Sequence, residues 1–501
     1  MDHSFAEAPV HDAVTAIIEH DGQVLLLRRC ENLLAFAGHY AFPGGKIDPG
    51  DAALAPPGFE SPRPQALGAL ARELREELGL DLFAPGAGIR IEHLTEVGFA
   101  LTPPLAPRRY AVRFFRLRLR SRPRLSIDTR EHDAFAWAAP GQWLERYATG
   151  TLLLAPPTLM ALRDLNENPE TPTLSRLAQF GGDGTWNDPD GPARDTVSGT
   201  VGAGAGRGPR PTPSSGASPP PPPAPTSLRS GTVSGPIPEH EPLAGLRVLF
   251  VRSNTLPPAA HTNCFLVGDE GRPRLLIDPS PADEYEYRRL RRQAAGRFDA
   301  VFLTHHHPDH HERADALARQ CAVPILCSAD THARIRARWP GFFDRIDVRE
   351  VADGQAVTCW LGRAVHALAV PGHDAGQLAL LPEDRAWCIV GDLIQGIGTV
   401  VIAPPEGDMG IYFATLERVI ALDPAVILPS HGQALGGTYY LRAALKHRRV
   451  REEQILRLYR AGADENRMLV EIYAGTPAAL LPLARVNIRS HLDKLAAEGR
   501  L

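Results

Sequence analysis

The densest group of potential metal ligands in this 501-residue chain lies between Thr304 and His311, which holds five of its 19 histidines. His305 and His307 alternate, and Asp309 and His310 follow directly. Neutral imidazoles together with a carboxylate are ligand types that suit zinc or iron. These four residues are too many ligands for one open site.

Three further candidate ligands occur later in the chain, each just beyond an apolar run. They are His373 after Pro371-Gly372, Asp392 after Gly391, and His431 after Pro429-Ser430. Short apolar runs predict buried strands, and ligands in α/β folds gather beyond the carboxyl ends of strands. We therefore expect these side chains to meet the histidine-rich segment at one edge of a sheet.

This HxHxDH motif, followed by single His, Asp and His residues, resembles the metallo-β-lactamase superfamily over about residues 246–432. The resemblance implies an αββα sandwich and a hydrolase that uses two divalent ions, zinc in the first place with iron or manganese as alternatives, to activate water. It implies that the first ion is bound by His305, His307 and His373, the second by Asp309, His310 and His431, and that Asp392 bridges both. Asp309 and Asp392 are thereby also the candidate catalytic residues.

Within the superfamily, segment 261–266, segment 391–409 and the C-terminal helices look most like the lactamase-like endoribonuclease group, which resembles glyoxalase II with a winged-helix-like tail. Residues 442–501 contain 12 Lys plus Arg against 7 Asp plus Glu, and a positive surface suits a phosphate backbone. We therefore expect phosphodiester hydrolysis, with single-stranded RNA as a candidate partner. A glyoxalase II-like thioesterase is the alternative, as is a tail that simply packs on the metal domain.

A second set of acids lies in the N-terminal half, on a helix predicted over 65–78. Glu73, Glu76 and Glu77 have helical spacing that places their carboxylates on one face, whereas four leucines form the opposite, buried stripe. Gly79 then supplies the helix stop. Clustered carboxylate oxygens are the ligands that Mg²⁺ or Mn²⁺ prefers. The leucines are Leu67, Leu70, Leu74 and Leu78.

Arg72 and these glutamates, with the preceding Gly44-Gly45 loop, resemble the Nudix box and its α/β/α fold. The resemblance implies hydrolysis of a diphosphate, with Glu76 as the candidate catalytic residue. The box departs from the family pattern because its first acid is Asp51 and a Pro-rich insertion separates it from Arg72.

A long insertion within the box, and part of an upstream signature in segments 25–30 and 38–45, resemble coenzyme A diphosphatases of the Nudix superfamily. The expected partner is a small diphosphate, either coenzyme A or a nucleotide derivative, and both halves could act on coenzyme A derivatives. Glu131 and Asp133 are candidates for a further acid outside the box. The alternative is a non-catalytic half that senses a nucleotide, since the insertion could spoil the site.

The alternation of strands and helices predicts a multidomain α/β and α+β protein. We expect a Nudix domain over 10–165, a metallo-β-lactamase domain over 246–436 and a winged-helix-like helical module over 439–501. Between them, Gly, Pro and Ser make up 32 of the 60 residues in 181–240, a composition typical of a disordered linker that lets the halves move independently.

The formal net charge of −4 gives no global positive field, so any binding to nucleic acid must be local. The six cysteines form no CxxC pair, which favours reduced thiols. Neither a secretory leader nor an apolar run of about 18 residues is evident. We therefore expect a cytoplasmic protein without a membrane partner, and the sequence leaves its oligomeric state open.

Overall fold

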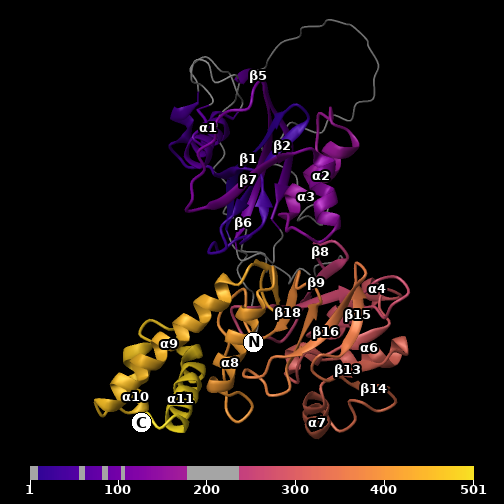
Figure 1. Cartoon of the computed structure of the whole chain (residues 1–501), viewed down its shortest axis with the longest axis vertical. Helices are drawn as coiled ribbons and strands as arrows, with labels where there is room; N and C mark the ends of the chain where they lie inside the picture. Colours follow the sequence, from indigo (N-terminus) through magenta and orange to yellow (C-terminus); the bar gives the residue numbers. More distant parts are fainter. Residues whose placement is uncertain (1–8, 56–62, 82–88, 103–107, 178–235) are drawn as a thin grey trace, which may run out of the picture.

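The computed structural model describes residues 9–55, 63–81, 89–102, 108–177 and 236–501. Figure 1 shows two lobes, one from each half of the chain, with the C-terminal helices α9, α10 and α11 beside the second lobe. Most of the predicted linker, 181–240, lies outside the described residues, and a strand already begins at Glu239. No helix in the described part of the chain has both the length and the hydropathy to cross a membrane.

The N-terminal lobe is built on one mixed sheet with the strand order β3-β2-β1-β6-β5, in which β4 also pairs with β1 and β7 with β2. Helix α1 packs its apolar side on one face of this sheet, and α2 and α3 cover the other, giving the predicted α/β/α layers. The elements are β1 (Val10–His20), β2 (Gln23–Arg29), β3 (Tyr40–Ala41), β4 (Gly44–Lys46), η1 (Asp51–Leu54), α1 (Pro64–Leu78), β5 (Ile89–Leu101), β6 (Arg109–Leu119), β7 (His132–Ala138), α2 (Pro140–Ala148) and α3 (Pro156–Glu167).

Helix α1 has the orientation that its leucine spacing predicts. All four leucines of the predicted stripe are buried, and Glu76, on the opposite side, is exposed. Gly79 ends the helix in a left-handed conformation, φ 64°, and its N–H bonds to Arg75 O. The helix therefore presents Glu76 to solvent, whereas Glu77 is buried beside the leucines.

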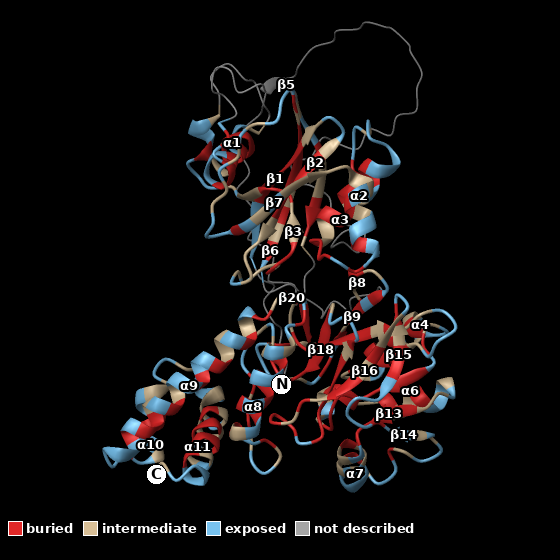
Figure 2. Ribbon diagram, viewed as in Figure 1, coloured by how far each residue is buried: buried red, intermediate tan, exposed pale blue. Residues whose placement is uncertain are grey.

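The second lobe contains two sheets that face each other and are covered by helices on both outer sides (Figures 1 and 2). Their order is β14-β13-β12-β11-β10-β9-β8 in one sheet and β15-β16-β17-β18-β19-β20 in the other. One apolar cluster fills the space between the sheets, and separate clusters pack α4, α6 and α7 on the first sheet and α8 on the second. The predicted αββα sandwich is thus confirmed.

The elements of this lobe alternate short strands with helices along the chain. They are β8 (Glu239–Leu243), β9 (Leu246–Arg252), β10 (His261–Val267), β11 (Leu275–Ile277), α4 (Glu284–Ala294), β12 (Ala300–Phe302), α5 (Pro308–His311), α6 (Ala314–Cys321), β13 (Ile325–Cys327), α7 (Ala329–Arg338), β14 (Val348–Glu350), β15 (Ala356–Trp360), β16 (Arg363–Ala369), β17 (Leu378–Pro382), β18 (Cys388–Gly391), α8 (Met409–Leu422), β19 (Val426–Pro429) and β20 (Leu435–Gly436).

The C-terminal module is helical in this structure, with its own small apolar cluster. Helix α9 runs along α8, and α11 contacts both α8 and α9, so the module packs on the second lobe. Its elements are α9 (Tyr439–Arg460), α10 (Glu465–Ile472), η3 (Ala478–Leu480) and α11 (Leu481–Ala497).

The two lobes also contact each other directly, which the linker composition did not predict. Leu153, from the N-terminal half, belongs to the apolar cluster between the two sheets of the second lobe. The Tyr147 hydroxyl donates to Glu241 O at 2.7 Å, and Gly436 N donates to Ala37 O at 2.9 Å. Apolar burial of this kind holds surfaces together whatever the linker between them. The expectation of independently moving halves is therefore wrong for this arrangement.

Candidate metal centre

The seven predicted ligands of the C-terminal half lie where strands of the two facing sheets end. His305 and His307 follow β12, His373 follows β16, Asp392 follows β18, and His431 follows β19. Strands β18 and β19 are parallel neighbours, so their carboxyl ends present Asp392 and His431 side by side. The edge of the sandwich thus collects ligands that lie up to 126 residues apart in the sequence.

The first group consists of His305, His307 and His373, whose ligand nitrogens all lie within 4.8 Å of one another. His307 Nδ1 is 3.0 Å from His305 Nε2 and 3.0 Å from His373 Nε2. The carboxylate of Asp392 is next to this group, with its Oδ2 3.9 Å from His373 Nε2. Three imidazoles are therefore already turned toward one point.

The second group consists of Asp309, His310 and His431, which meet the same 4.8 Å limit. Asp309 Oδ2 is 3.5 Å from His431 Nε2 and 3.9 Å from His310 Nε2. The other carboxylate oxygen of Asp392 completes the group, since Oδ1 is 3.4 Å from His431 Nε2 and 3.6 Å from His310 Nε2. Asp392 thus stands between the two groups, as a bridging ligand must.

Burial and neighbouring charges fix the charge states of these groups. Burial lowers the pKa of His307 to about 4, and His373 and His306 act in the same direction. Burial opposes charge on Asp392, but the imidazoles of His431 and His310 outweigh it and hold the pKa of this carboxyl well below its usual range. The centre therefore offers a neutral imidazole at His307 and an ionised carboxylate at Asp392, both ready to bind a cation.

The residues fit two divalent ions. His310 Nε2 and Asp392 Oδ1 are buried and have no hydrogen-bond partner among the described residues, a costly state for polar atoms unless they face a ligand. Imidazole nitrogens with a shared carboxylate are donors that suit zinc and, in the same arrangement, iron or manganese. Two such ions would supply an activated water and polarise the bond under attack.

Three ligands are oriented through their second ring nitrogen. His310 Nδ1 is 2.8 Å from Asp278 Oδ2, His431 Nδ1 is 2.8 Å from His261 O, and His373 Nδ1 is 2.8 Å from Val401 O. Such contacts fix the tautomer and the direction of each ring. Sequence reasoning missed Asp278, although it follows strand β11 just as Asp392 follows β18.

His306, which matches no ligand position, forms a separate polar group at the rim. Its Nδ1 pairs with Asp374, and its Nε2 is 3.3 Å from Glu406 Oε1. Glu406 Oε2 also lies 3.5 Å from His307 Nε2. Glu406 lies within segment 391–409, where a single acid in a Pro-rich loop gives no signal by itself.

The acids of the N-terminal half are arranged differently. Arg72 donates to Asp51 at 2.8 Å and to Glu73 at 2.8 Å, and it lies 3.3 Å from Glu76. The two ends of the insertion therefore meet, despite the 20 residues between Asp51 and Arg72. Part of the insertion, residues 56–62, lies outside the described residues.

Glu77 is buried and accepts a hydrogen bond from Gly44 N at 2.9 Å. Burial, together with the charge of the neighbouring Glu73, raises the pKa of Glu77 to about 8. At Gly45 a side chain would collide with Glu73, since a Cβ would lie 2.2 Å from its Oε1. The Gly44-Gly45 loop is thus packed directly against the acids, as the Nudix resemblance implies.

The described residues of the N-terminal half contain no trio of ligand atoms within 4.8 Å, so Glu73, Glu76 and Glu77 do not converge as closely as the histidine groups. Of the two acids outside the box, Glu131 is close enough to raise the pKa of Glu77, whereas Asp133 is paired with Arg28.

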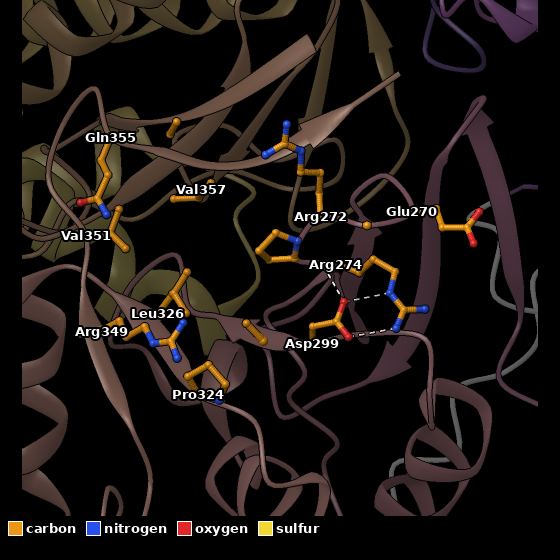
Figure 3. A pocket seen from close by; sticks show the side chains of 14 residues that line it. Glu270, Arg272, Arg274, Asp299, Pro324, Leu326, Arg349, Val351, Gln355 and Val357 are labelled. Carbon is orange, nitrogen blue, oxygen red and sulfur yellow. Dashed lines mark hydrogen bonds and ion pairs between the residues drawn. The ribbon is translucent and has the colours of Figure 1, made fainter. Parts of the chain in front are cut away.

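A hollow of about 1010 Å³ lies elsewhere in the second lobe (Figure 3). It opens at the amino ends of β12 and β13, near Asp299 and Pro324, and Arg274 pairs with Asp299 inside it. The candidate ligands lie at the opposite, carboxyl ends of the strands. The hollow is therefore separate from the metal centre.

Three family models match the chain. Residues 257–431 match the metallo-beta-lactamase superfamily, residues 9–151 match the NUDIX domain, and residues 468–501 match the beta-lactamase associated winged helix domain. The first match spans all seven candidate ligands, and the second spans the whole predicted box.

Similar proteins include the Drosophila melanogaster beta-lactamase-like protein 2 homolog, 29% identical over 48% of this chain and 84% of that protein. The hydroxyacylglutathione hydrolase of Acidiphilium cryptum is 32% identical over 42% of this chain and 81% of that protein. An atrochrysone carboxyl ACP thioesterase of Paecilomyces divaricatus is 28% identical over 43% of this chain and 67% of that protein.

Among solved structures, a beta-lactamase domain protein from Burkholderia ambifaria is 20% identical, with a TM-score of 0.45 over 52% of this chain and 88% of that one. A NUDIX hydrolase from Alicyclobacillus acidocaldarius is 25% identical, with a TM-score of 0.30 over 35% of this chain and all of that one.

Proposed function

This chain is a hydrolase of the metallo-β-lactamase superfamily that also carries a Nudix domain and a winged helix domain, and we propose that its C-terminal half hydrolyses the thioester of a small acyl-thiol. The observation that supports a two-metal hydrolase is the position of Asp392 between the two ligand groups. Such a centre serves thioesters and phosphodiesters alike, so the substrate must be argued separately.

Two features favour a thioester. The names of two similar proteins, a hydroxyacylglutathione hydrolase and an ACP thioesterase, both describe the cleavage of an acyl-thiol. In addition, most of the positive charge of the C-terminal module is neutralised. Ion pairs with carboxylates are formed by seven of its cations, Arg442, Arg449, Arg467, Arg485, Arg489, Lys494 and Arg500.

The chain's own residues would divide the work. The histidines and Asp309 hold the ions, Asp392 keeps the two ion positions close together, and Asp278 fixes the ring of His310. Glu406, beside His307 at the rim, is placed to exchange protons with solvent.

The test is thiol release by the full-length protein from S-lactoylglutathione and acetyl-coenzyme A, followed with a thiol-reactive dye. We expect turnover of at least one thioester by the zinc-loaded protein and loss of turnover in Asp392→Asn, with metal content measured in parallel. Glu76→Gln is the matched control, because it changes only the N-terminal site. A fully metal-loaded protein that releases no thiol but cleaves RNA would overturn the thioester proposal.

Phosphodiester hydrolysis of single-stranded RNA is the second candidate. It is favoured by Lys446, Arg457 and Arg460, for which the described chain shows no carboxylate partner. Cleavage of a short labelled RNA by the wild type but not by Asp392→Asn would support it.

For the N-terminal half we propose hydrolysis of a nucleotide or coenzyme A diphosphate with Mg²⁺ or Mn²⁺ bound by Glu73, Glu76 and Glu77. The packing of the Gly44-Gly45 loop against Glu73 and Glu77 supports this. Release of the two half-products from coenzyme A and from ADP-ribose, compared between wild type and Glu76→Gln, tests it. Tight nucleotide binding with no turnover in either protein would instead indicate a sensor.

If both halves accept coenzyme A compounds, the two activities could act in turn on one molecule, with the thioester cut at one site and the diphosphate at the other. This link predicts that coenzyme A is cleaved in preference to ADP-ribose. A preference for nucleotide diphosphates would remove it.

A further inference from the structure

One ligand of the metal centre is oriented by a loop that the C-terminal module holds. His373 Nδ1 bonds to Val401 O at 2.8 Å, which leaves Nε2 for the ligand cluster. Val401 lies between β18 and α8, where the backbone has no strand or helix to satisfy its hydrogen bonds. A buried backbone segment of this kind needs partners from elsewhere in the molecule.

Those partners are two side chains of the C-terminal helices. Arg448, on α9, donates from Nη2 to Val400 O, and Asn487, on α11, accepts from Ile402 N at 3.0 Å. The residues on both sides of Val401 are thus fixed by the module. Arg448 Nη1 also donates to Asn487 Oδ1 at 3.2 Å, so the two side chains act as one clamp.

The clamp is buried, which makes its partners energetically important. Arg448 and Asn487 are 6% and 5% exposed. Within the described chain, Arg448 forms no ion pair with a carboxylate. Its guanidinium contacts Val400 O, Asn487 and the face of Tyr412, 5.8 Å from the ring centre. A buried cation is costly unless its donors are satisfied, so the loop and the guanidinium depend on each other.

We propose that Arg448 and Asn487 are positioning residues of the metal centre, which hold Val400–Ile402 in the place where Val401 O orients His373. The C-terminal module then completes one of the two ligand groups. This inference rests on the proposed dinuclear centre, and it gives the module a role that needs no nucleic acid. Groups that orient a metal-binding histidine are typically worth about 10- to 100-fold in metal affinity.

The experiment measures metal affinity in the full-length protein by competition with a chromophoric chelator. Asn487→Leu removes the acceptor for Ile402 N, whereas Asn487→Asp retains it and is the matched conservative variant. We expect two zinc ions in the wild type, an affinity about 10- to 100-fold weaker at one ion only in Asn487→Leu, and near wild-type affinity in Asn487→Asp. Arg448→Met should resemble Asn487→Leu.

Val450→Ala, an exposed change on the same helix, controls for general effects on α9. Replacing zinc by cobalt adds a second readout, the absorption spectrum of the bound ions. In Asn487→Leu and Arg448→Met this spectrum should change for the ion held by the His373 group and not for the other ion. A merely structural role would leave the spectrum unchanged. If Asn487→Leu and Arg448→Met melt earlier but bind both ions as tightly as the wild type, the residues only hold helices together and the inference is overturned. A wild-type protein that binds no pair of ions would instead overturn the proposed function.

Discussion

The two candidate sites of this chain differ in how far they are assembled without a metal. In the C-terminal half, the ligand atoms of each histidine group already lie within 4.8 Å of one another, and several of the residues are buried. In the N-terminal half, Arg72 engages Asp51 and Glu73, and Glu76 is exposed. Loops at strand ends hold the C-terminal ligands close together, whereas the acids of α1 are engaged by Arg72 and Gly44 N and would have to exchange these partners for a cation.

The largest expected contrast is in the response to metal removal. Treatment with a strong chelator should lower the rate of thioester hydrolysis by a factor of at least about 10³, because the ions supply several kcal/mol of transition-state stabilisation. Addition of Mg²⁺ alone should restore diphosphate hydrolysis only, since Mg²⁺ prefers oxygen ligands to imidazoles. Both activities would be assayed on one sample before and after each addition. Recovery of thioester hydrolysis with Mg²⁺ would contradict the distinction between the sites.

A second contrast concerns pH. The pKa of Glu77 is raised to about 8 by burial and by Glu73, so below that pH the carboxyl carries a proton in the metal-free protein. Metal binding must release this proton, and the affinity for Mg²⁺ should therefore rise by up to about tenfold per pH unit up to about pH 8 and then level off.

Titration calorimetry with Mg²⁺ between pH 6 and 9 measures this dependence. Glu77→Gln should bind Mg²⁺ more weakly at pH 8 and show a shallower pH dependence, while Glu145→Gln, an exposed change on α2, should behave as the wild type. A wild-type affinity that does not change with pH would show that Glu77 is ionised before the metal arrives.

The contact between the lobes at Gly38 and Gly436 should contribute to the stability of the protein. A Cβ at Gly38 would lie 2.7 Å from Gly436 Cα, so Gly38→Val should force the lobes apart and lower the free energy of unfolding by about 1–3 kcal/mol beyond the cost of its φ of 71°. Gly22→Val has nearly the same φ, 69°, and no neighbour within 4 Å, which makes it the matched control. Chemical denaturation compares them. Equal losses in both variants would mean that the contact contributes nothing.

The smallest expected effect on thioester hydrolysis comes from Lys446 and Arg457, which have no carboxylate partner among the described residues. Replacing Lys446 and Arg457 together with glutamine should change thioester hydrolysis by less than about twofold, because exposed charges away from a site contribute little. The measurement is the ratio of kcat to KM for the thioester at low and moderate salt. A large fall in RNA cleavage by the same variant would strengthen the second candidate function.

The sequence was informative where a ligand type and a strand end coincide. His305, His373, Asp392 and His431 each follow an apolar run, and parallel strands bring such ends together whatever lies between them. The acids of α1 were predicted for a similar reason, since helical spacing decides which face they share. Asp278 was within reach of the same reasoning.

Other parts of the site leave no pattern in the sequence. Val401 acts through a backbone carbonyl, which every residue has. Arg448 and Asn487 are single polar residues on helices and resemble ordinary surface positions until packing buries them. The contact between Ala37 and Gly436 joins two short segments 399 residues apart, and the linker composition pointed the other way.

The contact between the lobes has a consequence for how the chain can be divided. Tyr147 and Leu153 of the first half bury themselves against the second, and a side chain at Gly150 would meet Trp360. A protease cut between residues 178 and 235 would break the covalent connection and leave these contacts in place. The products should then remain together as a noncovalent heterodimer, and each half made alone should expose an apolar surface and tend to aggregate. In that sense the two halves are subunits of an assembly that is encoded as one polypeptide.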